Sequence, residues 1–486
     1  MVSDQKQIQV NSSNMLTDEE RLQCKDSKQN LPTVYDTYTK FKKNSILLII
    51  SGLGFLSSLD ELIYVPALST VVQDLHTTDT LGLLTVTVYV LGSCFGGLIW
   101  GVLTDYYGRR SIMLFALSGF LLSVVGSYFS PNIHIFLVSR ILQGAFICVA
   151  QIVGQATVAD IFQPNERGRA TAFFYAFYFM GSLVGPTVGG QLSYRFGWRS
   201  TFIVVEILAI VLFIFYVLFV PETHQYIIVC KYHKTGTTLL EYDLLVKPKL
   251  QNPCSTLAYL KETTILPYVF VLAIGYMSMN VAQVFISTKL SKAPYDYKPD
   301  LIGMLYLPIS IAKFLGSIIG GILSDYAAVK YMETSRIDEK RVVPALLFSI
   351  LTPIGLVIYG WSFQYGMYVS LPVMGLILCA FGQTATRPGI YSFYTIKYQQ
   401  YSANVIAANN FVQLLLTSIM LTSTPIIVES IGSGLYFTTM AVGNILATIV
   451  PAMIISRKTR LSSNTTEHMP SQSTHLISTD ARQYDK

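Results

Sequence analysis

Twelve long apolar runs divide this chain of 486 residues, and they constrain its fold more than any other feature. A helix needs ~20 mostly apolar residues to cross a bilayer, and each run is close to that length. The runs lie near 44–70, 80–103, 111–130, 134–159, 168–193, 199–221, 265–290, 300–325, 342–362, 367–393, 402–427 and 433–455. Only 13% of the residues are charged, whereas soluble domains carry roughly 25%. We therefore expect an all-α membrane protein with twelve transmembrane helices in two six-helix bundles.

A polar stretch at 222–264 separates the first six runs from the last six. An even number of spans places both termini on one side, and Lys and Arg concentrate on the cytosolic side of membrane proteins. Most of the basic residues lie on the side of the termini, which is therefore expected to be cytosolic. The predicted parts are a disordered cytosolic tail over 1–43, a helix bundle over 44–221, a cytosolic loop over 222–264, a second bundle over 265–455 and a disordered cytosolic tail over 456–486.

Composition and motif content argue against several functional classes. The net charge is +6, but the basic residues are scattered between apolar runs and form no nucleic-acid-binding stripe. The six cysteines show neither a disulfide framework nor metal-ligand spacing. The polar N-terminal region shows no cleavable signal peptide. No nucleotide-binding loop or catalytic triad appears, so we expect a protein that is not an enzyme, needs no cofactor and draws its energy from an ion gradient.

The segment Gly96–Arg110, GGLIWGVLTDYYGRR, marks a tight loop between two apolar runs. Its glycines let helix backbones approach closely, and Gly108 permits a sharp turn. A partial echo, GSIIGGILSDY, lies six helices later at Gly316–Tyr326 and contains Asp325. Internal repeats of this kind are typical of secondary transporters, whose substrate site lies near the membrane midplane.

Three motifs resemble signatures of a known family. Gly101–Arg110 resembles the cytosolic loop signature of the major facilitator superfamily. Arg140–Gly144, RILQG, resembles the fourth-helix signature of its drug:proton antiporters, and Gly181–Gly190, GSLVGPTVGG, closely resembles their fifth-helix signature. The resemblance covers about 44–455. It is greatest to the fungal twelve-helix drug:proton antiporters, in the style of the quinidine-resistance and dityrosine-exporter branch.

The resemblance implies the major facilitator fold and secondary active transport. The expected activity is proton-coupled antiport that exports drugs or small organic molecules by alternating access. The motif residues expected to act in the conformational change are Gly101, Asp105, Gly108, Arg109, Arg110, Gly181, Gly185, Pro186, Gly189, Gly190 and Asp325. We expect a monomer in the plasma membrane, with a vacuolar or other internal membrane as the alternative.

Ionisable residues inside the apolar runs are candidate functional groups. Each costs at least ~2.5–3.5 kcal/mol to place in a membrane, so chance occurrence is disfavoured. Three are acids, Asp60, Glu61 and Glu206, and three are bases, Arg140, Lys313 and Arg387. Our hypothesis is that Asp60 or Glu61 carries the proton with Arg140 as its partner, and that Glu206 lies at the same depth. The alternative is a permanent ion pair that only fixes helix packing.

Lys313 and Arg387 have no obvious acidic partner in the second half of the sequence. They either pair with Asp60 or Glu61, or bind a substrate carboxylate, which favours a zwitterionic or anionic cargo; Lys313 has snorkelling as a further alternative. Aromatic and amide side chains suit amphiphilic organic molecules such as drugs, organic cations, zwitterions or amino-acid-derived metabolites. The candidates are Tyr64, Tyr276, Asn280, Gln283, Phe381, Tyr391 and Asn410, for each of which ordinary helix packing is the alternative.

Two other functions are compatible with these features. One is an importer of an organic nutrient or metabolite with the same fold, either proton-coupled or facilitative. The antiporter-like fifth helix argues against it, and the pH dependence of flux separates the two. The other is a membrane sensor that does not transport, which is disfavoured because such sensors carry longer cytosolic tails.

Overall fold

The computed structural model describes residues 34–234, 250, 252–334, 342–397 and 402–467. Within these residues every regular element is a helix. The chain divides into two compact units: residues 1–255 with 297–304, and residues 256–296 with 305–486. We refer to them as unit 1 and unit 2.

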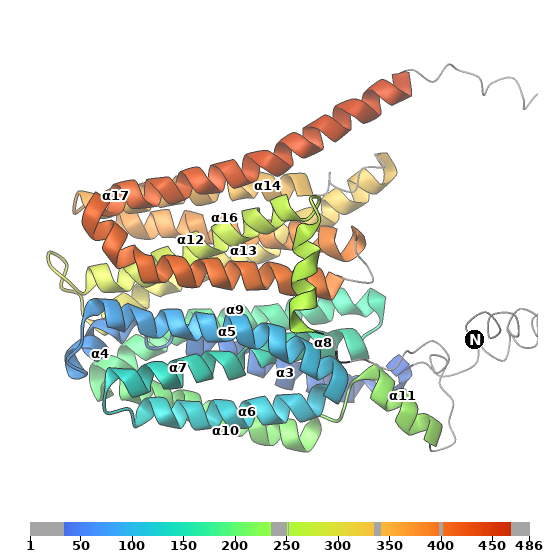
Figure 1. Ribbon diagram of the computed structural model, residues 1–486, viewed down its shortest axis with the longest axis horizontal. Helices are drawn as coiled ribbons and strands as arrows, with labels where there is room; N and C mark the ends of the chain where they lie inside the picture. Colours follow the sequence, from blue (N-terminus) through green and yellow to red (C-terminus); the bar gives the residue numbers. More distant parts are fainter. Residues whose placement is uncertain (1–33, 235–249, 251, 335–341, 398–401, 468–486) are drawn as a thin grey trace, which may run out of the picture. The chain divides into compact units, whose positions relative to one another are not determined.

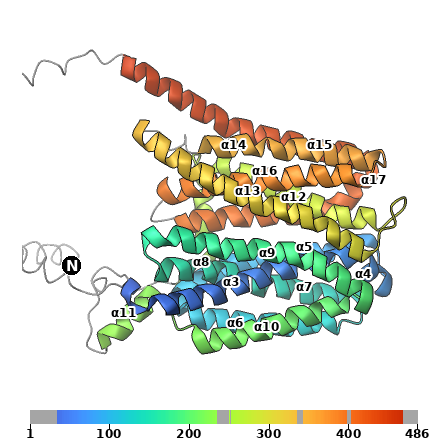
Figure 2. The same cartoon turned by 180° about the vertical axis from the view of Figure 1, so that it is seen from behind.

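Unit 1 contains the helices of the first half of the chain (Figure 1). They are η1 (Val34–Thr37), α3 (Lys40–Leu62), η2 (Val65–Ala67), α4 (Leu68–Asp74), α5 (Asp79–Tyr107), α6 (Arg109–Tyr128), α7 (Ile133–Ile147), α8 (Val149–Ile161), α9 (Pro164–Phe196), α10 (Arg199–Phe219) and α11 (Gln225–Lys234). Side-chain caps set several of the starts: Thr78 accepts the backbone N–H of Leu81 at α5, and Asn132 accepts that of Ile135 at α7. Helices α5 and α7 pack side by side, as do α3 and α9 (Figure 2).

Unit 2 contains the helices of the second half. They are α12 (Leu266–Leu290), most of α13 (Pro299–Thr334), α14 (Val343–Ser349), α15 (Leu351–Gln364), α16 (Ser370–Lys397) and α17 (Ser402–Glu467). A short helix, η3 (Pro253–Lys261), crosses the boundary between the units in the sequence. Helix α17 is two helices joined at Gly432, whose φ of 81° interrupts the helical backbone.

Ten described helical segments are long and apolar enough to cross a membrane. One of them, Asn404–Arg457, contains the break at Gly432 and therefore accounts for two of the predicted spans. Helix α16 is long enough to be a span but carries several polar residues in its middle, Gln383 and Arg387 among them. With these two adjustments the prediction of twelve helices in two six-helix bundles is confirmed.

The glycines of α9 let it approach α3 backbone to backbone. A Cβ atom at Gly181 would lie 2.3 Å from the carbonyl oxygen of Phe55, and one at Gly189 would lie 1.7 Å from that of Ile63. At Gly185 the corresponding distance, to the Leu59 oxygen, is 3.0 Å. Close packing of this kind is how helices associate in lipid, where apolar contact alone gives little driving force. It fixes the height of α3, and so the position of Asp60, against α9.

The other face of the same motif contacts the start of α13, which belongs to unit 1. A Cβ atom at Gly190 would lie 2.4 Å from the carbonyl oxygen of Pro299 and 3.1 Å from the Cα atom of Gly303. Pro186 lies inside α9 without ending the helix. The backbone of α13 includes Asp325, but the placement of its side chain lies outside the described part of the structure.

Several local features differ from the sequence-based expectation. Helix α17 continues to Glu467, inside the tail predicted to be disordered at 456–486, and η1 and the start of α3 lie inside the one predicted at 1–43. The first predicted span lies within the candidate span Lys40–Asp74, but it is not one continuous helix, because α3 stops at Leu62 and the chain continues through the short helix η2 into α4. Pro66 lies in that short helix and cannot donate the backbone hydrogen bond that a continuous helix needs there. The predicted loop at 222–264 contains helices α11 and η3. Neither was expected, because their short polar sequences lack the length and apolar character of a span.

Candidate functional site

A buried polar cluster lies at the contact of α3 and α7 in unit 1. The side chains of Asp60, Arg140 and Gln143 each have 0% of their surface exposed. Gln143 Nε2 donates to Asp60 Oδ1 over 2.9 Å, and Arg140 Nη1 donates to Gln143 Oε1 over 2.7 Å. Arg140 Nη1 itself lies 3.8 Å from Asp60 Oδ1. The carboxylate and the guanidinium are therefore linked mainly through an amide, with a longer ion pair beside it.

Two tyrosine rings hold the guanidinium of Arg140 in place. Its Cζ atom lies 4.2 Å from the ring centre of Tyr89 on α5 and 4.5 Å from that of Tyr64. Such contacts are worth about 2 kcal/mol when desolvated. Tyr64 lies four residues after Asp60, a spacing that places two residues on one face of a continuous helix. Although α3 ends before Tyr64, its ring still reaches the same arginine, and its hydroxyl pairs with Thr85 over 3.0 Å.

The other two acids of the apolar runs are placed differently. Glu61 follows Asp60 on α3 and is half-buried, and Asp60 is the acid that forms the ion pair with Arg140. Glu206 lies on α10, and its Oε2 atom is buried with no hydrogen-bond partner among the described residues. That oxygen is therefore not a member of the cluster.

A second charged cluster lies at the corner between α5 and α6. Arg109 forms ion pairs with Asp105, one helical turn before it, and with Asp160 on α8. The Arg109 Nε–Asp160 Oδ2 distance is 3.1 Å. The side chain of Asp160 is 13% exposed and that of Asp105 is 65% exposed. Arg110 donates from Nη2 to the carbonyl oxygen of Val217 over 2.8 Å.

Glu222 completes this corner by capping α6. Its carboxylate accepts the backbone N–H groups of Arg109 over 2.9 Å and Arg110 over 3.2 Å. These are donors at a helix N-terminus, where a negative charge is favourable. Gly108 has a φ of 96°, and a Cβ atom on it would lie 2.6 Å from Glu222 Oε2. Burial lowers the pKa of the neighbouring His224, and the charge of Arg109 lowers it further, so this imidazole is neutral at neutral pH.

Unit 2 brings together many of the predicted substrate residues. Lys313 Nζ donates to Gln283 Oε1 over 2.6 Å, and Arg387 Nη2 donates to Gln413 Oε1 over 3.2 Å. The guanidinium of Arg387 lies 5.2 Å from the ring centre of Tyr276. A charged and amide-rich row thus runs along α12 and reaches α13, α16 and α17.

The remaining substrate candidates are also in unit 2. Tyr391 donates its hydroxyl proton to Asn410 Oδ1 over 2.9 Å. Asn280 donates to the carbonyl oxygen of Tyr276 one turn earlier, which is ordinary helix hydrogen bonding. The ring of Phe381 packs edge-on against Phe348. Asn280 and Phe381 therefore have structural contacts that need no ligand to explain them.

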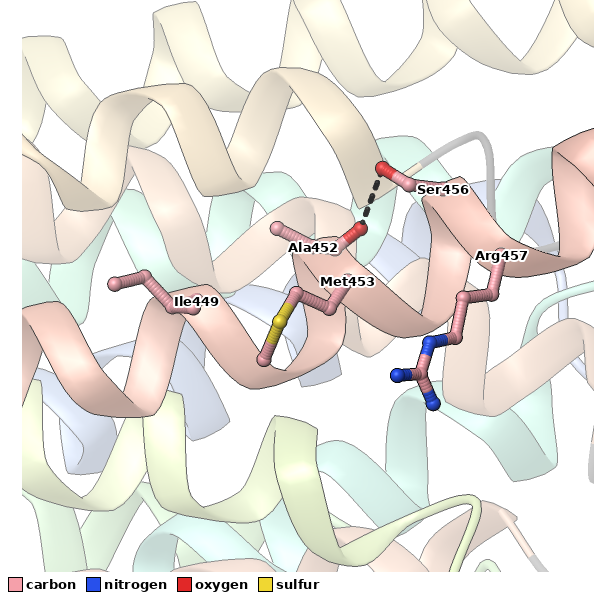
Figure 3. A pocket seen from close by; sticks show the side chains of 5 residues that line it. All are labelled: Ile449, Ala452, Met453, Ser456 and Arg457. Carbon is pink, nitrogen blue, oxygen red and sulfur yellow. Dashed lines mark hydrogen bonds between the residues drawn. The ribbon is translucent and has the colours of Figure 1, made fainter.

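A shallow pocket on α17 is separate from these clusters. Figure 3 shows the side chains that line it, which are Ile449, Ala452, Met453, Ser456 and Arg457. All five are exposed, and Ser456 donates to the carbonyl oxygen of Ala452 on its own helix. A pocket on one exposed helix face, lined mostly by apolar side chains, is not a polar transport site.

Several functional candidates were missed in the sequence. Gln143 belongs to the RILQG motif, and its spacing of three residues from Arg140 places both on one helix face. Tyr89, Asp160 and Glu222 contact partners that are 51 to 113 residues away in the chain. No local pattern predicts such partners.

Units of long apolar helices, each holding charged and amide side chains in its interior, define a multi-pass membrane transporter. The chain belongs to the Major Facilitator Superfamily, whose family profile matches residues 50–421. The chain is therefore a transporter and not an enzyme.

The relatives of the chain include fungal transporters of this superfamily. It is 21% identical to the MFS antiporter QDR3 of Candida albicans, over 82% of this chain and 75% of that protein. It is 26% identical to the efflux pump radE of Floropilus chiversii, over 78% of this chain and 73% of that protein. The fold is that of the xylose transporter XylE from E. coli, with a TM-score of 0.60 at 17% identity over 84% of this chain and 98% of that one. The resemblance to fungal transporters of the drug-efflux kind is confirmed.

Proposed function

We propose that this chain is a proton-coupled antiporter that exports drugs or other small organic molecules. The observation that carries the proposal is the carboxylate of Asp60, fully buried and joined through Gln143 to Arg140. An ionisable group at such a position is costly and needs a function. The ion pair between Asp60 and Arg140 supports a mechanism in which Asp60 takes up a proton when its contact with Arg140 weakens.

The mechanism follows from the geometry of the cluster. A nearby guanidinium stabilises an ionised carboxylate, and that stabilisation weakens when the two groups separate. Gln143 lies between them, so a small shift of α7 against α3 changes both hydrogen bonds together. Asp60 then gains or loses its proton according to the conformation of unit 1. The rings of Tyr64 and Tyr89 keep Arg140 oriented during this exchange.

The α5–α6 corner is proposed to govern the change of conformation. Arg109 is shared by a buried acid, Asp160, and an exposed acid, Asp105. The exposed partner is the one that can be released without burying an unpaired charge. Gly108, at a φ of 96°, allows the turn that holds this corner.

The proposed cellular setting rests on other observations. A relative is named an antiporter and another an efflux pump, which supports export as the direction of transport. The bias of Lys and Arg along the sequence supports cytosolic termini. We further propose a monomer in the plasma membrane, powered by the proton gradient with no cofactor.

Transport assays on the purified protein test this proposal. The chain is first expressed in a yeast strain lacking its own efflux transporters, and a growth screen identifies a toxic compound that it exports. Uptake of that compound into proteoliposomes is then measured with an imposed pH gradient. The unaltered chain should accumulate it, and collapse of the gradient with a protonophore should stop accumulation.

Two matched variants assign the proton carrier. Asp60→Asn should abolish gradient-driven accumulation while retaining exchange of compound for compound without a gradient. Glu61→Gln removes the adjacent acid on the same helix and should retain gradient-driven accumulation. Full gradient-driven accumulation by Asp60→Asn would overturn the assignment, and accumulation that is independent of pH in the unaltered chain would overturn proton coupling itself.

A further inference from the structure

Unit 2 holds two buried amide donors that have no hydrogen-bond partner among the described residues. The amide oxygen of Gln283 accepts a hydrogen bond from Lys313, and that of Gln413 accepts one from Arg387. A lysine or arginine side chain can only donate hydrogen bonds, so it must face the amide oxygen and not the NH2 group. This requirement fixes which way each glutamine amide is oriented. The Nε2 atoms of both glutamines therefore point away from the cations, and they have no hydrogen-bond acceptor among the described residues.

These donors are deeply buried. Gln283 is 0% exposed and Gln413 is 2% exposed, so water access from bulk is small. A buried donor without an acceptor costs about 1–3 kcal/mol, and native proteins keep few of them without a reason. These two donors lie beside the positively charged side chains of Lys313 and Arg387. Together the amide donors and the nearby charge favour a ligand group that is negatively charged and rich in hydrogen-bond acceptors.

Lys313 on α13 and Arg387 on α16 both contact residues on one face of α12. Tyr276, which contacts Arg387, and Gln283, which contacts Lys313, are seven residues apart and so share a helix face. That spacing corresponds to about 10 Å along the helix. The ring of Tyr276 beside Arg387 supplies an apolar surface next to the charge, as an organic anion with a hydrophobic body requires.

We propose that unit 2 binds a carboxylate group of an organic substrate, with Arg387 and Gln413 as its direct contacts and Lys313 with Gln283 as a second donor pair. The cargo is then an anionic or zwitterionic molecule with an aromatic or apolar body. This inference rests on the proposed function only in assuming that a ligand of unit 2 is cargo. Binding itself requires no gradient and no particular direction of transport.

Equilibrium binding to the purified full-length protein tests the site. The probes are N-acetyl-phenylalanine and benzoate, each compared with its neutral amide, which has the same ring and lacks the charge. Stabilisation against thermal unfolding in detergent, titrated with each probe, gives the dissociation constants. The carboxylates should bind at least about tenfold more tightly than the amides, since hydrogen bonds between charged groups are the strong ones. Equal binding of acid and amide, or no saturable carboxylate binding, would overturn the proposal.

Variants test whether the carboxylate binds at the donors Lys313, Gln283, Arg387 and Gln413. Arg387→Gln and Gln413→Leu should each weaken carboxylate binding at least about tenfold, with little change for the amide probes. Arg387→Lys keeps the charge and loses the planar donor pair, so its affinity should be intermediate. Lys289→Gln removes a positive charge from the last turn of α12, away from these four donors, and serves as the control. Carboxylate binding should be unchanged in this variant. Equal effects of Lys289→Gln and Arg387→Gln would show a general charge effect and contradict the site.

Asp60→Asn separates this inference from the proposed function. The substitution lies in unit 1 and should leave carboxylate binding intact while it abolishes gradient-driven transport. Carboxylate binding by the unaltered chain, if its transport is independent of the proton gradient, would contradict only the proposed antiport. Gradient-driven transport that shows no preference for carboxylate-bearing compounds contradicts only the site in unit 2.

Discussion

Single residues decide how charge is held inside this transporter. Gln143 keeps Asp60 and Arg140 joined while separating their charged atoms to 3.8 Å. If the charged atoms of Asp60 and Arg140 were in close contact, the pair would be harder to separate. If they lay apart without Gln143 between them, two buried charges would have no partner. At the α5–α6 corner Glu222 has a comparable role, since its carboxylate accepts two backbone donors that begin α6.

Gly108 should be sensitive to substitution where Gly101, in the same motif, is not. Gly108→Ala forces a side chain into a φ of 96° and towards Glu222 Oε2, whereas a Cβ atom at Gly101 meets nothing within 4 Å. We expect Gly108→Ala to lower the free energy of unfolding by about 1–3 kcal/mol and Gly101→Ala to leave it unchanged. Equilibrium unfolding in mixed detergent and SDS measures both, and equal losses would contradict this account.

The two acids that bind Arg109 should differ in what they support. Asp160→Asn leaves a mostly buried guanidinium underpaired and should cost about 3 kcal/mol of stability. Asp105→Asn removes an exposed partner, 65% accessible, and should cost less than about 1 kcal/mol. We expect Asp105→Asn to fold and reach the membrane normally but to transport much more slowly. Unchanged turnover in efflux assays would reduce Asp105 to a surface contact.

At the scale of elements, the pairing of α9 with α3 is set by glycines spaced four residues apart. Gly181, Gly185 and Gly189 face the carbonyl oxygens of Phe55, Leu59 and Ile63, which are spaced in the same way. This register places Asp60, one residue beyond Leu59, at a defined height in unit 1. The packing of α9 against α3 therefore also positions Asp60 within the charged cluster.

Alanine substitutions along α9 should give graded losses of stability. The Cβ atom of Gly189→Ala would lie 1.7 Å from the Ile63 oxygen, and that of Gly185→Ala would lie 3.0 Å from the Leu59 oxygen. We expect Gly189→Ala to cost about 3 kcal/mol and Gly185→Ala about 1 kcal/mol or less. Thermal unfolding in detergent gives the order, and a larger loss for Gly185→Ala would show that the register in solution differs.

At the scale of the whole molecule, the chain is a multi-pass transporter of the Major Facilitator Superfamily with two six-helix units. Its inner charges are divided between the units in a consistent way. Unit 1 contains the acids Asp60, Glu61 and Glu206, with Arg140 paired to Asp60. Unit 2 contains Arg387 and Lys313 with their glutamine partners. Proton binding and substrate binding are thus proposed for different units.

Membrane topology is the prediction that belongs to this scale. Both termini should be cytosolic, so tags on either end should resist external protease in intact cells and become accessible after permeabilisation. The sequons at Asn11 and Asn464 should carry no glycan, because glycosylation occurs on the opposite side of the membrane. Cleavage of either tag in intact cells, or a glycan at either site, would reverse the proposed orientation.

The class of the protein, the number of spans and the charged residues inside the membrane could all be predicted from the sequence alone. Each of these depends on local composition, because a bilayer requires about 20 apolar residues per helix whatever their neighbours are. Which of those charges lie together depends on the packing of the helices. Arg140 forms an ion pair with Asp60, and Gln143, Glu222 and Gln413 lie at the charged contacts. Those pairings depend on how helices pack against one another, which apolar periodicity does not encode.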